Sequence, residues 1–558
     1  MIRSTSDGWR PRLHADPWLF ASGVVVLLVL APVVALLAAA RPGSDDLWRH
    51  LLAYVLPTAA RDSLILLTGV GLLTTIVGTG TAWLVTAYEF PGRRTFDWAL
   101  LLPLAVPTYI VAYAYLDVLH PVGPVQTALR ALLGYDSPRD FRLPDVRSMT
   151  GCIVLLGFVL YPYVYLTTRA MFLMQSANLI DVARTLGVGR RAVFFRVALP
   201  LARPAVAVGV SLALMEALND IGASEFLGVR TMTVSIYSTW VTRSDLAGAA
   251  QIAIAMLAVV LGLVLFERWA RRRRRYANDA QHPRPLVPHR LQGVAAAVAL
   301  AACTVPVVIG FAVPTAYLVQ AAVSRVRFAG IPALVVREAV NTIAVSVIAT
   351  LLTLAGGVAV IYAVRVGRGR LPSVLSRLAS IGYALPGTVL ALGLLPVITG
   401  LDGLLDRVGL AVFGVSSGLF LLGSGAGLVY AYFVRFLTIA AGGVESGLSR
   451  LSTSLDDAAR TLGERAGGRL RRIHIPLARP AMAAAALLVF VDCMKELPAT
   501  LLLRPLGFET LATHLYGEAV RGTYEDAAIA ALLIVIVGIV PVVVLARVGR
   551  AGDLGGGE

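Results

Sequence analysis

Uncharged apolar runs recur along the whole chain, separated by short stretches that are rich in arginine and glycine. A run of about twenty apolar residues is long enough to cross the hydrocarbon core of a bilayer as a helix. The pattern predicts an all-α integral membrane protein with twelve spans, six in each half of the chain. In chain order they are expected at Trp18–Ala40, Ser63–Tyr88, Trp98–Leu119, Thr150–Leu173, Ala205–Leu227, Ala247–Phe266, Leu291–Val319, Ala339–Val364, Leu375–Thr399, Ser417–Ala440, Ala481–Leu503 and Ala527–Ala546.

The first run ends in Ala38-Ala39-Ala40 after basic residues, which also resembles a cleavable signal peptide. Its apolar segment is longer than a usual signal core. We therefore predict a retained span and keep the signal peptide as the alternative.

Composition agrees with a membrane protein: 57% of the residues are hydrophobic, 15% are charged and the mean hydropathy is +0.77. The formal net charge of +16 would suggest nucleic acid in a soluble chain. Here the arginines gather in short loops between spans, so the expected partner is the bilayer and not nucleic acid. Cys152, Cys303 and Cys493 lie in apolar runs without metal-ligand spacing, which favours small core residues.

Basic loops fix the expected orientation, because cytoplasmic loops of membrane proteins carry the excess of arginine. The relevant residues are Arg3, Arg10, Arg12, Arg93, Arg94, Arg268, Arg271 to Arg275, Arg365, Arg368 and Arg370. All fall on one side of the membrane if the N-terminus is cytoplasmic. We therefore expect a multi-pass protein of the cytoplasmic (inner) membrane with both termini inside.

A basic segment divides the chain. Residues 268–290 contain five consecutive arginines and three prolines without apolar periodicity, as in a solvated linker. It separates a first six-helix half, residues 1–267, from a second, residues 291–558.

The two halves repeat a polar segment. Asp181-Val-Ala-Arg-Thr-Leu-Gly187 recurs 276 positions later as Asp457-Ala-Ala-Arg-Thr-Leu-Gly463, and Pro200-Leu-Ala-Arg-Pro-Ala205 recurs unchanged as Pro476-Leu-Ala-Arg-Pro-Ala481. With six spans in each half, the copies must be parallel, so both segments face the cytoplasm. A polar helix between spans is common, but two copies at matched spacing on one side indicate a function.

Each copy reads as a short helix followed by a turn. Asn178 and Ser454 are expected as N-caps, with Asp181 and Asp457 in the first turn. Ala183 and Ala459 are expected to allow close approach to a partner, and Gly187 and Gly463 to let the chain turn. Pro200 and Pro476 are expected to end the basic helix that follows, and Pro204 and Pro480 to begin the next span.

These residues resemble the signature of the permease subunits of binding-protein-dependent ABC importers, E-A-A-x-x-x-G, nine residues, then I-x-L-P. The two copies here read D-V-A-x-x-x-G with V-x-L-P and D-A-A-x-x-x-G with I-x-I-P, so aspartate replaces the glutamate in both. The resemblance implies that the segment is a coupling helix that inserts into a groove of an ATPase subunit. The residues implied in this contact are Asp181, Ala183, Gly187, Leu199, Pro200, Asp457, Ala458, Ala459, Gly463, Ile473 and Pro476.

Two such helices in one chain imply a fused permease that contacts two ATPase subunits. The family also implies an extracytoplasmic solute-binding protein, and the longest outer loop, Leu119–Met149, is the expected docking surface. Val491–Thr500 and Arg504–Thr513 resemble the C-terminal half of ferric-iron importer permeases, which implies ferric iron as the solute. Permeases for thiamine and for phosphonate-type solutes share the same plan and remain alternatives.

Two of the predicted spans contain acidic residues. Glu216 and Asp220 lie one helical turn apart, Asp492 and Glu496 occupy the matching positions of the second half, and Lys495 matches Asn219. A charge at mid-bilayer costs about 2.5–3.5 kcal/mol on insertion scales, so these groups should face a polar path or a partner. They either line the solute path or hold the spans together by hydrogen bonds and ion pairs.

No catalytic constellation is present. The chain has no G-x-x-x-x-G-K-[ST] loop, no H-E-x-x-H pair and no serine elbow, so we expect no enzyme activity, no cofactor and no bound metal. ATP must then be hydrolysed by a separate subunit. The rival interpretation is a 6+6 secondary transporter driven by an ion gradient, which has no use for a duplicated coupling helix.

Overall fold

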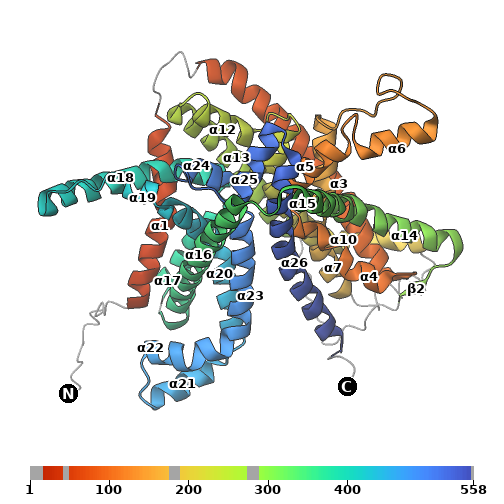
Figure 1. Ribbon diagram of the computed structural model, residues 1–558. Helices are drawn as coiled ribbons and strands as arrows, with labels where there is room; N and C mark the ends of the chain where they lie inside the picture. The colour runs from red at the N-terminus through yellow and green to blue at the C-terminus, as the bar shows by residue number, and fades with distance from the viewer. Residues whose placement is uncertain (1–16, 42–48, 175–188, 273–287, 368, 555–558) are drawn as a thin grey trace, which may run out of the picture.

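The computed structural model describes residues 17–41, 49–174, 189–272, 288–367 and 369–554 (Figure 1). The elements of the first half are α1 (Pro17–Ala39), η1 (Leu51–Val55), α3 (Leu56–Ala87), β1 (Tyr88–Glu89), α4 (Arg93–Ala99), η2 (Leu102–Ala105), α5 (Thr108–Val118), α6 (Pro124–Leu133), α7 (Met149–Met174), α9 (Arg190–Val193), η3 (Phe194–Ala198), α10 (Leu199–Asn219), α11 (Gly222–Phe226), α12 (Met232–Val241) and α13 (Leu246–Arg272).

After the linker come β2 (His289–Arg290), α14 (Gly293–Val307), η4 (Val308–Ala312), α15 (Val313–Ala329), α16 (Ala333–Val366), α17 (Leu371–Ala379), η5 (Ser380–Ala384), α18 (Gly387–Phe413), α19 (Phe420–Gly423), α20 (Ala426–Ser449), α21 (Thr453–Thr461), α22 (Ala466–Arg469), η6 (Leu470–His474), α23 (Ile475–Met494), α24 (Pro498–Leu503), α25 (Leu511–Arg521) and α26 (Tyr524–Leu554). The two short strands β1 and β2 pair in parallel.

The described residues contain eleven helices long and apolar enough to cross a membrane, or twelve if one bent pair is counted as a span. This confirms the all-α membrane class. The bent pair is the expected third span, where residues 93–105 and 108–118 meet at 90° around Pro107. In the expected ninth span the chain likewise breaks into α17, η5 and α18, with Pro386 before α18.

The expected fifth and eleventh spans are wrong at both ends. Their helical stretches begin at Phe194 and Ala466, well before the predicted Ala205 and Ala481, and end at Asn219 and Met494. The apolar residues that follow form the separate short helices α11 and α24. Both breaks fall at acidic residues, described below.

Prolines do not interrupt the helices as expected. Each of the four π-turns in the described residues (η1, η3, η4 and η6) is followed directly by one apolar residue and a proline. The wider turn accommodates a residue that has no N–H and whose ring would clash in a regular α-helix. Helices therefore run on through Pro200 and Pro476, and Pro204 and Pro480 lie inside them; the prediction that the first pair ends a helix and that the second pair begins one is wrong.

The first helix of each half packs on the other half. α1 lies against α16, α17 and α18, where its Val25, Val26 and Val29 join a core built from second-half residues. In exchange, α14, η4 and α15 pack against α3, α5 and α7, and the Tyr115 hydroxyl donates to the Ile309 carbonyl at 2.9 Å. The close contact between α1 and α18 requires glycine, because a Cβ on Gly393 would lie 2.2 Å from the Pro32 carbonyl oxygen.

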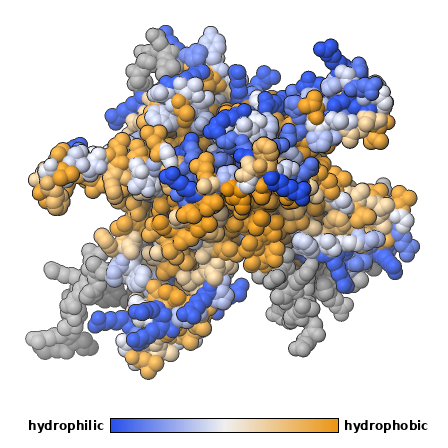
Figure 2. Space-filling view, viewed as in Figure 1, coloured by the Kyte–Doolittle hydropathy of each residue, from blue (hydrophilic) through white to orange (hydrophobic). Residues whose placement is uncertain are grey.

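An apolar band crosses the middle of the molecule, with hydrophilic surface at both ends (Figure 2). α21 and α22 project from one end, which also holds the first turn of α1 and the last turns of α26 (Figure 1). α6, α12 and α25 lie at the opposite end. The band and its two polar ends are the surface that a bilayer requires.

Candidate functional site

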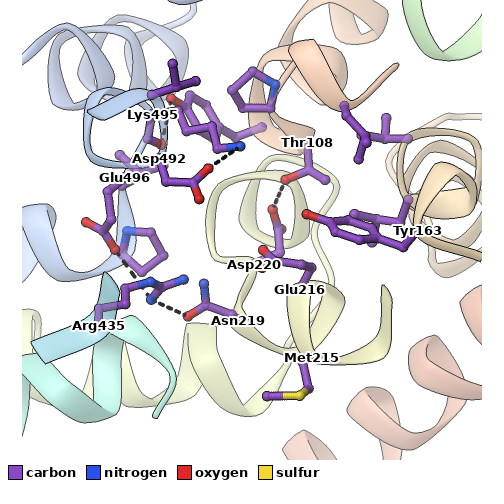
Figure 3. A pocket seen from close by; sticks show the side chains of 18 of the residues that line it. Thr108, Tyr163, Met215, Glu216, Asn219, Asp220, Arg435, Asp492, Lys495 and Glu496 are labelled. Atoms are coloured by element: carbon purple, nitrogen blue, oxygen red, sulfur yellow. Dashed lines mark hydrogen bonds and ion pairs between the residues drawn. The ribbon is translucent and has the colours of Figure 1, made fainter. Parts of the chain in front are cut away.

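A cavity of about 350 Å³ is lined by residues of both halves. Its wall includes the ends of α10 and α23, the start of α5, and parts of α7, α20 and α26. All six residues expected along a solute path line it: Glu216, Asn219, Asp220, Asp492, Lys495 and Glu496 (Figure 3). The structure thus brings together groups that are 276 positions apart in the sequence.

Two of the four acids are helix caps. Asp220 is the residue at which α10 ends, and its Oδ1 accepts the Ser224 backbone N–H of α11 at 2.9 Å while its Oδ2 accepts the Thr108 hydroxyl. Glu496 does the same for α24, accepting the backbone N–H groups of Ala499 and Thr500 at 3.0 and 3.1 Å. A carboxylate at a helix N-terminus satisfies free donors and the positive end of the dipole. These caps are the physical reason that the predicted spans break here.

The other two acids face the cavity. Asp492 Oδ1 lies 2.8 Å from Lys495 Nζ, a pair within one helical turn. Glu216 makes no hydrogen bond or ion pair with the described residues, and its side chain points into the space beside Tyr163 (Figure 3). The four acids are therefore divided: Asp220 and Glu496 cap helices, whereas Asp492 pairs with Lys495 and Glu216 lies on the cavity wall without an ion pair to the described residues.

Arg435 is a site residue that the sequence reasoning missed. Its guanidinium donates to Asn219 Oδ1 at 3.2 Å and lies 3.6 Å from Glu496 Oε1, so it joins α20 to both halves (Figure 3). Asn219 Oδ1 also accepts the Gly387 N–H at 2.7 Å. The available signal was an arginine inside the predicted span Ser417–Ala440, because such a charge needs a partner at membrane depth.

The cavity wall combines four carboxylates with two cationic side chains, Arg435 and Lys495. Among the described residues, no group of three or more His, Cys, Asp or Glu side chains has the geometry of a metal site. The wall therefore offers more carboxyl groups than cationic groups, together with hydrogen-bonding groups.

The second copy of the repeated segment forms α21, which projects from the bundle. Its N-cap is Ser452, whose hydroxyl accepts the Ser454 N–H at 3.2 Å, so the prediction of Ser454 as the cap is wrong by two residues. Gly463 follows the helix with a φ of +81°, and the Glu464 N–H bonds back to the Ala459 carbonyl at 2.9 Å. The expected glycine turn is thus present, since this left-handed conformation strains residues with a Cβ.

The two alanines of α21 face opposite ways. Ala459 is buried within the chain, whereas Ala458 is exposed beside Asp457, which pairs with Arg460 on the surface at 3.3 Å. The expectation that Ala459 faces a partner is therefore wrong, and Ala458 is the alanine left open. Asp456, which the sequence reasoning did not single out, is buried under the helix.

The remaining residues of the signature lie where helices leave the projecting region. Ile473 is partly buried in η6, and Pro476 lies at the start of α23. Leu199 and Pro200 occupy the equivalent start of α10. Asn178, Asp181, Ala183 and Gly187 of the first copy lie outside the described residues.

A membrane protein whose two similar halves enclose a polar cavity, with a helix projecting from one end, belongs to the class of transport permeases. Residues 75–276 and 352–549 each match the family described as binding-protein-dependent transport system inner membrane component. The chain belongs to this family, and the two matches cover more than half of its length.

Three relatives illustrate the range of the family. The chain is 23% identical to Fe(3+)-transport system permease protein FbpB 2 of Haemophilus influenzae over 84% of this chain and 86% of the relative. It is 24% identical to a probable ABC transporter permease protein, y4fN, of Sinorhizobium fredii over 92% of both chains. It is 30% identical to molybdenum transport system permease protein ModB of Escherichia coli over 34% of this chain and 82% of the relative.

The chain is therefore the permease of an ABC importer, a multi-pass protein of the inner membrane and not an enzyme. ATP is hydrolysed in these systems by a separate ATPase subunit, and a binding protein delivers the solute. The matches to the two relatives that align over both halves also agree with the fused arrangement expected from the repeat.

Proposed function

We propose that this permease imports ferric iron, delivered by an extracytoplasmic binding protein and driven by two ATPase subunits. The observation that carries the proposal is the charge of the cavity, where four carboxylates outnumber Arg435 and Lys495. A wall of this sign favours a cation and opposes an oxyanion such as molybdate or sulfate. The likeness to the Haemophilus influenzae ferric-iron permease along most of both chains supports the same solute.

The orientation that fits this role places the α21 end of the molecule in the cytoplasm. Arg365, which pairs with Asp456 of α21, then lies on the cytoplasmic side together with the first turn of α1 and the last turns of α26, in agreement with the expected distribution of arginines (Figure 1). The exposed surface of α21, with Asp457 and Ala458, is then open to an ATPase groove. Residues 181–187 are proposed to form the second such contact.

The opposite end is proposed to receive the binding protein. The loop Leu119–Met149 contains α6, which extends from the bundle beside α5 (Figure 1). Closure of two ATPase subunits would draw the two coupling helices together and rock the halves. The cavity between the halves would then open toward opposite sides of the membrane in turn.

Thiamine is a second candidate, because the cavity fits an aromatic cation as well as a metal ion. Tyr109, Tyr163 and Tyr383 line the wall together with the acids, and aromatic faces attract organic cations. A phosphonate would meet the same negative wall as molybdate.

Uptake into proteoliposomes that contain the complete complex tests the proposal. Radiolabelled ferric iron, thiamine and molybdate are supplied in turn with the cognate binding protein, and ATP-dependent accumulation is measured. Iron uptake alone is expected; accumulation of molybdate in its place would refute the charge argument.

One substitution tests the path within the same assay. Glu216→Gln removes the unpaired carboxylate of the cavity wall. Loss of about 1.4 kcal/mol of favourable interaction with the passing cation corresponds to a tenfold effect, so iron uptake is expected to fall about tenfold. Glu445→Gln, on an exposed carboxylate of α20 outside the cavity, is the matched control and should leave uptake unchanged. Equal uptake by the two variants would remove Glu216 from the path.

A further inference from the structure

Beneath the projecting helix α21, four ionisable side chains from three parts of the second half meet around one buried carboxylate. We call Asp456, Arg365, Arg469 and His474 the Asp456 cluster. Arg365 at the end of α16 approaches Asp456 Oδ2 at 2.8 Å, and Arg469 Nη1 and His474 Nε2 lie 3.4 and 3.1 Å from Oδ1. Asp456, Arg469 and His474 are all buried, and His474 is fully so.

The cluster ties α21 to the ends of several spans at once. Besides Asp456, the Arg365 guanidinium donates to the carbonyls of Leu448, in the last turn of α20, and of Leu451, just after that helix. The Tyr362 hydroxyl of α16 donates to the Ala466 carbonyl at 2.7 Å. Charge-assisted hydrogen bonds shielded from water are strong and directional, so α21 is held rigidly on the bundle.

His474 connects the Asp456 cluster to the cavity. It lies in the π-turn that continues into α23, and residues 466–494 form one uninterrupted helical stretch of 29 residues. At about 1.5 Å per residue this stretch is roughly 40 Å long. Its far end carries Asp492 on the cavity wall, and Lys495 and Glu496, which follow the stretch, line the same wall.

The first half has no equivalent cluster in its sequence. The positions that match Asp456, Arg469 and His474 at the 276-residue offset hold Ile180, Val193 and Ala198, none of which ionises, and the position that matches Arg365 holds an acid, Glu89. The sequence of the first half therefore lacks the ionisable groups that surround Asp456 in the second half, although the two signatures are alike.

We infer that Asp456 is a positioning residue of the transport cycle, through which movement of α21 is transmitted to α23 and so to the second-half wall of the cavity. The coupling is specific to the second half. The inference rests on the proposed contact of α21 with an ATPase subunit, and it does not depend on which solute is carried.

Two positions report on the two halves separately. Met215 on α10 and Leu488 on α23 both line the cavity, so each can be replaced singly by cysteine and labelled with a maleimide. The three native cysteines are buried, and labelling of the parent chain gives the background. Labelling rates are compared in the complete complex in lipid nanodiscs, without nucleotide and with ATP and vanadate.

In the parent sequence, nucleotide is expected to change the labelling rate at both positions. Asp456→Asn keeps the shape of the side chain but removes its charge. It is expected to reduce the nucleotide effect at Leu488→Cys by roughly fivefold or more, the lower end of the range for coupling between protein sites. The effect at Met215→Cys should persist, because that helix does not contact the cluster.

Asp97→Asn is the matched control. It breaks a two-point ion pair between α4 and α7, in which the Arg169 Nε and Nη2 donate to the Asp97 carboxylate at 2.7 Å each, away from α21. It should leave both nucleotide effects intact. If Asp456→Asn does not assemble with the ATPase, Arg365→Lys is used in its place. It retains the charge but loses the guanidinium, whose Nε and Nη2 both approach Asp456 Oδ2, and a smaller loss confined to Leu488→Cys is expected.

Equal losses at the two reporters would show that Asp456 only stabilises the fold and would overturn the inference. The same holds if nucleotide has no effect at Leu488→Cys in the parent chain, or if Asp456→Asn leaves that effect unchanged. Because no solute is added, the result is independent of whether iron is transported.

Discussion

Glu496 and Glu216 are both glutamates on the cavity wall, but the structure predicts opposite consequences of replacing them with glutamine. Glu496 is buried and accepts the N–H groups of Ala499 and Thr500 and the Thr500 hydroxyl. In Glu496→Gln one oxygen becomes an NH₂ group that cannot accept any of these donors.

The expected loss follows from the number of donors left without a partner. An unsatisfied buried donor costs about 1–3 kcal/mol, and loss of a helix cap typically costs about 1 kcal/mol. We therefore expect Glu496→Gln to lower the free energy of unfolding by about 2–3 kcal/mol. Glu216→Gln leaves no described donor unpaired and should change it by less than about 0.5 kcal/mol.

Equilibrium unfolding of the purified permease in mild detergent measures both variants under one condition. Glu496→Asp is the informative comparison, because Asp220 caps α11 from the matching position with the shorter side chain. It should lose less than Glu496→Gln. Equal stabilities of Glu216→Gln and Glu496→Gln would refute the division of the acids into caps and path residues.

Three further outcomes are expected. Gly463→Val places a branched residue at a φ of +81°, at a cost of about 1–2 kcal/mol, and should abolish stimulation of ATP hydrolysis by the loaded binding protein while the complex still assembles; normal stimulation would contradict the coupling role. Gly393→Ala drives a Cβ against the Pro32 carbonyl and should destabilise the permease by about 1–3 kcal/mol in thermal unfolding, whereas an unchanged midpoint would contradict the close packing of α1 on α18. Burial lowers the pKa of His514, but its hydrogen bond to Glu338 and the Glu338 charge outweigh this and raise the pKa above 6.5. The stabilisation is therefore complete below pH 6.5 and lost as pH rises through the folded pKa, and unfolding midpoints measured across this range should lose that dependence in Glu338→Gln.

Hydropathy was sufficient to predict most spans, because a lipid-facing helix must be apolar over its whole length. It failed at residues 220–227 and 496–503, where the chain leaves one helix and enters another. Ile221, Phe226 and Leu227 are as buried as residues of a span, so an apolarity scan cannot detect the break. The signal was local: an acid that can cap the following turn, with Gly222 in one half and Pro498 two residues after the acid in the other.

The six cavity residues were predictable because a charge in an apolar run needs a compensating environment. Their division into helix caps and other cavity-wall acids was not, because it depends on which backbone N–H groups lie within reach of each carboxylate. The sequence analysis did not single out Asp456, for a related reason. It is adjacent to the signature residue Asp457, and only the packing of α21 shows that one carboxylate faces inward and the other outward.

The exchange of first helices has a consequence for how the permease can be divided. If the polypeptide were cleaved between residues 268 and 290, the first helix of each fragment would still pack against the other fragment. Dissociation of the fragments would expose valine and alanine side chains that are now buried against protein. The two fragments should therefore remain associated as one complex. A half expressed alone would lack the surface of the other half on which its first helix packs. Folded halves should therefore be obtained only when the two are co-expressed.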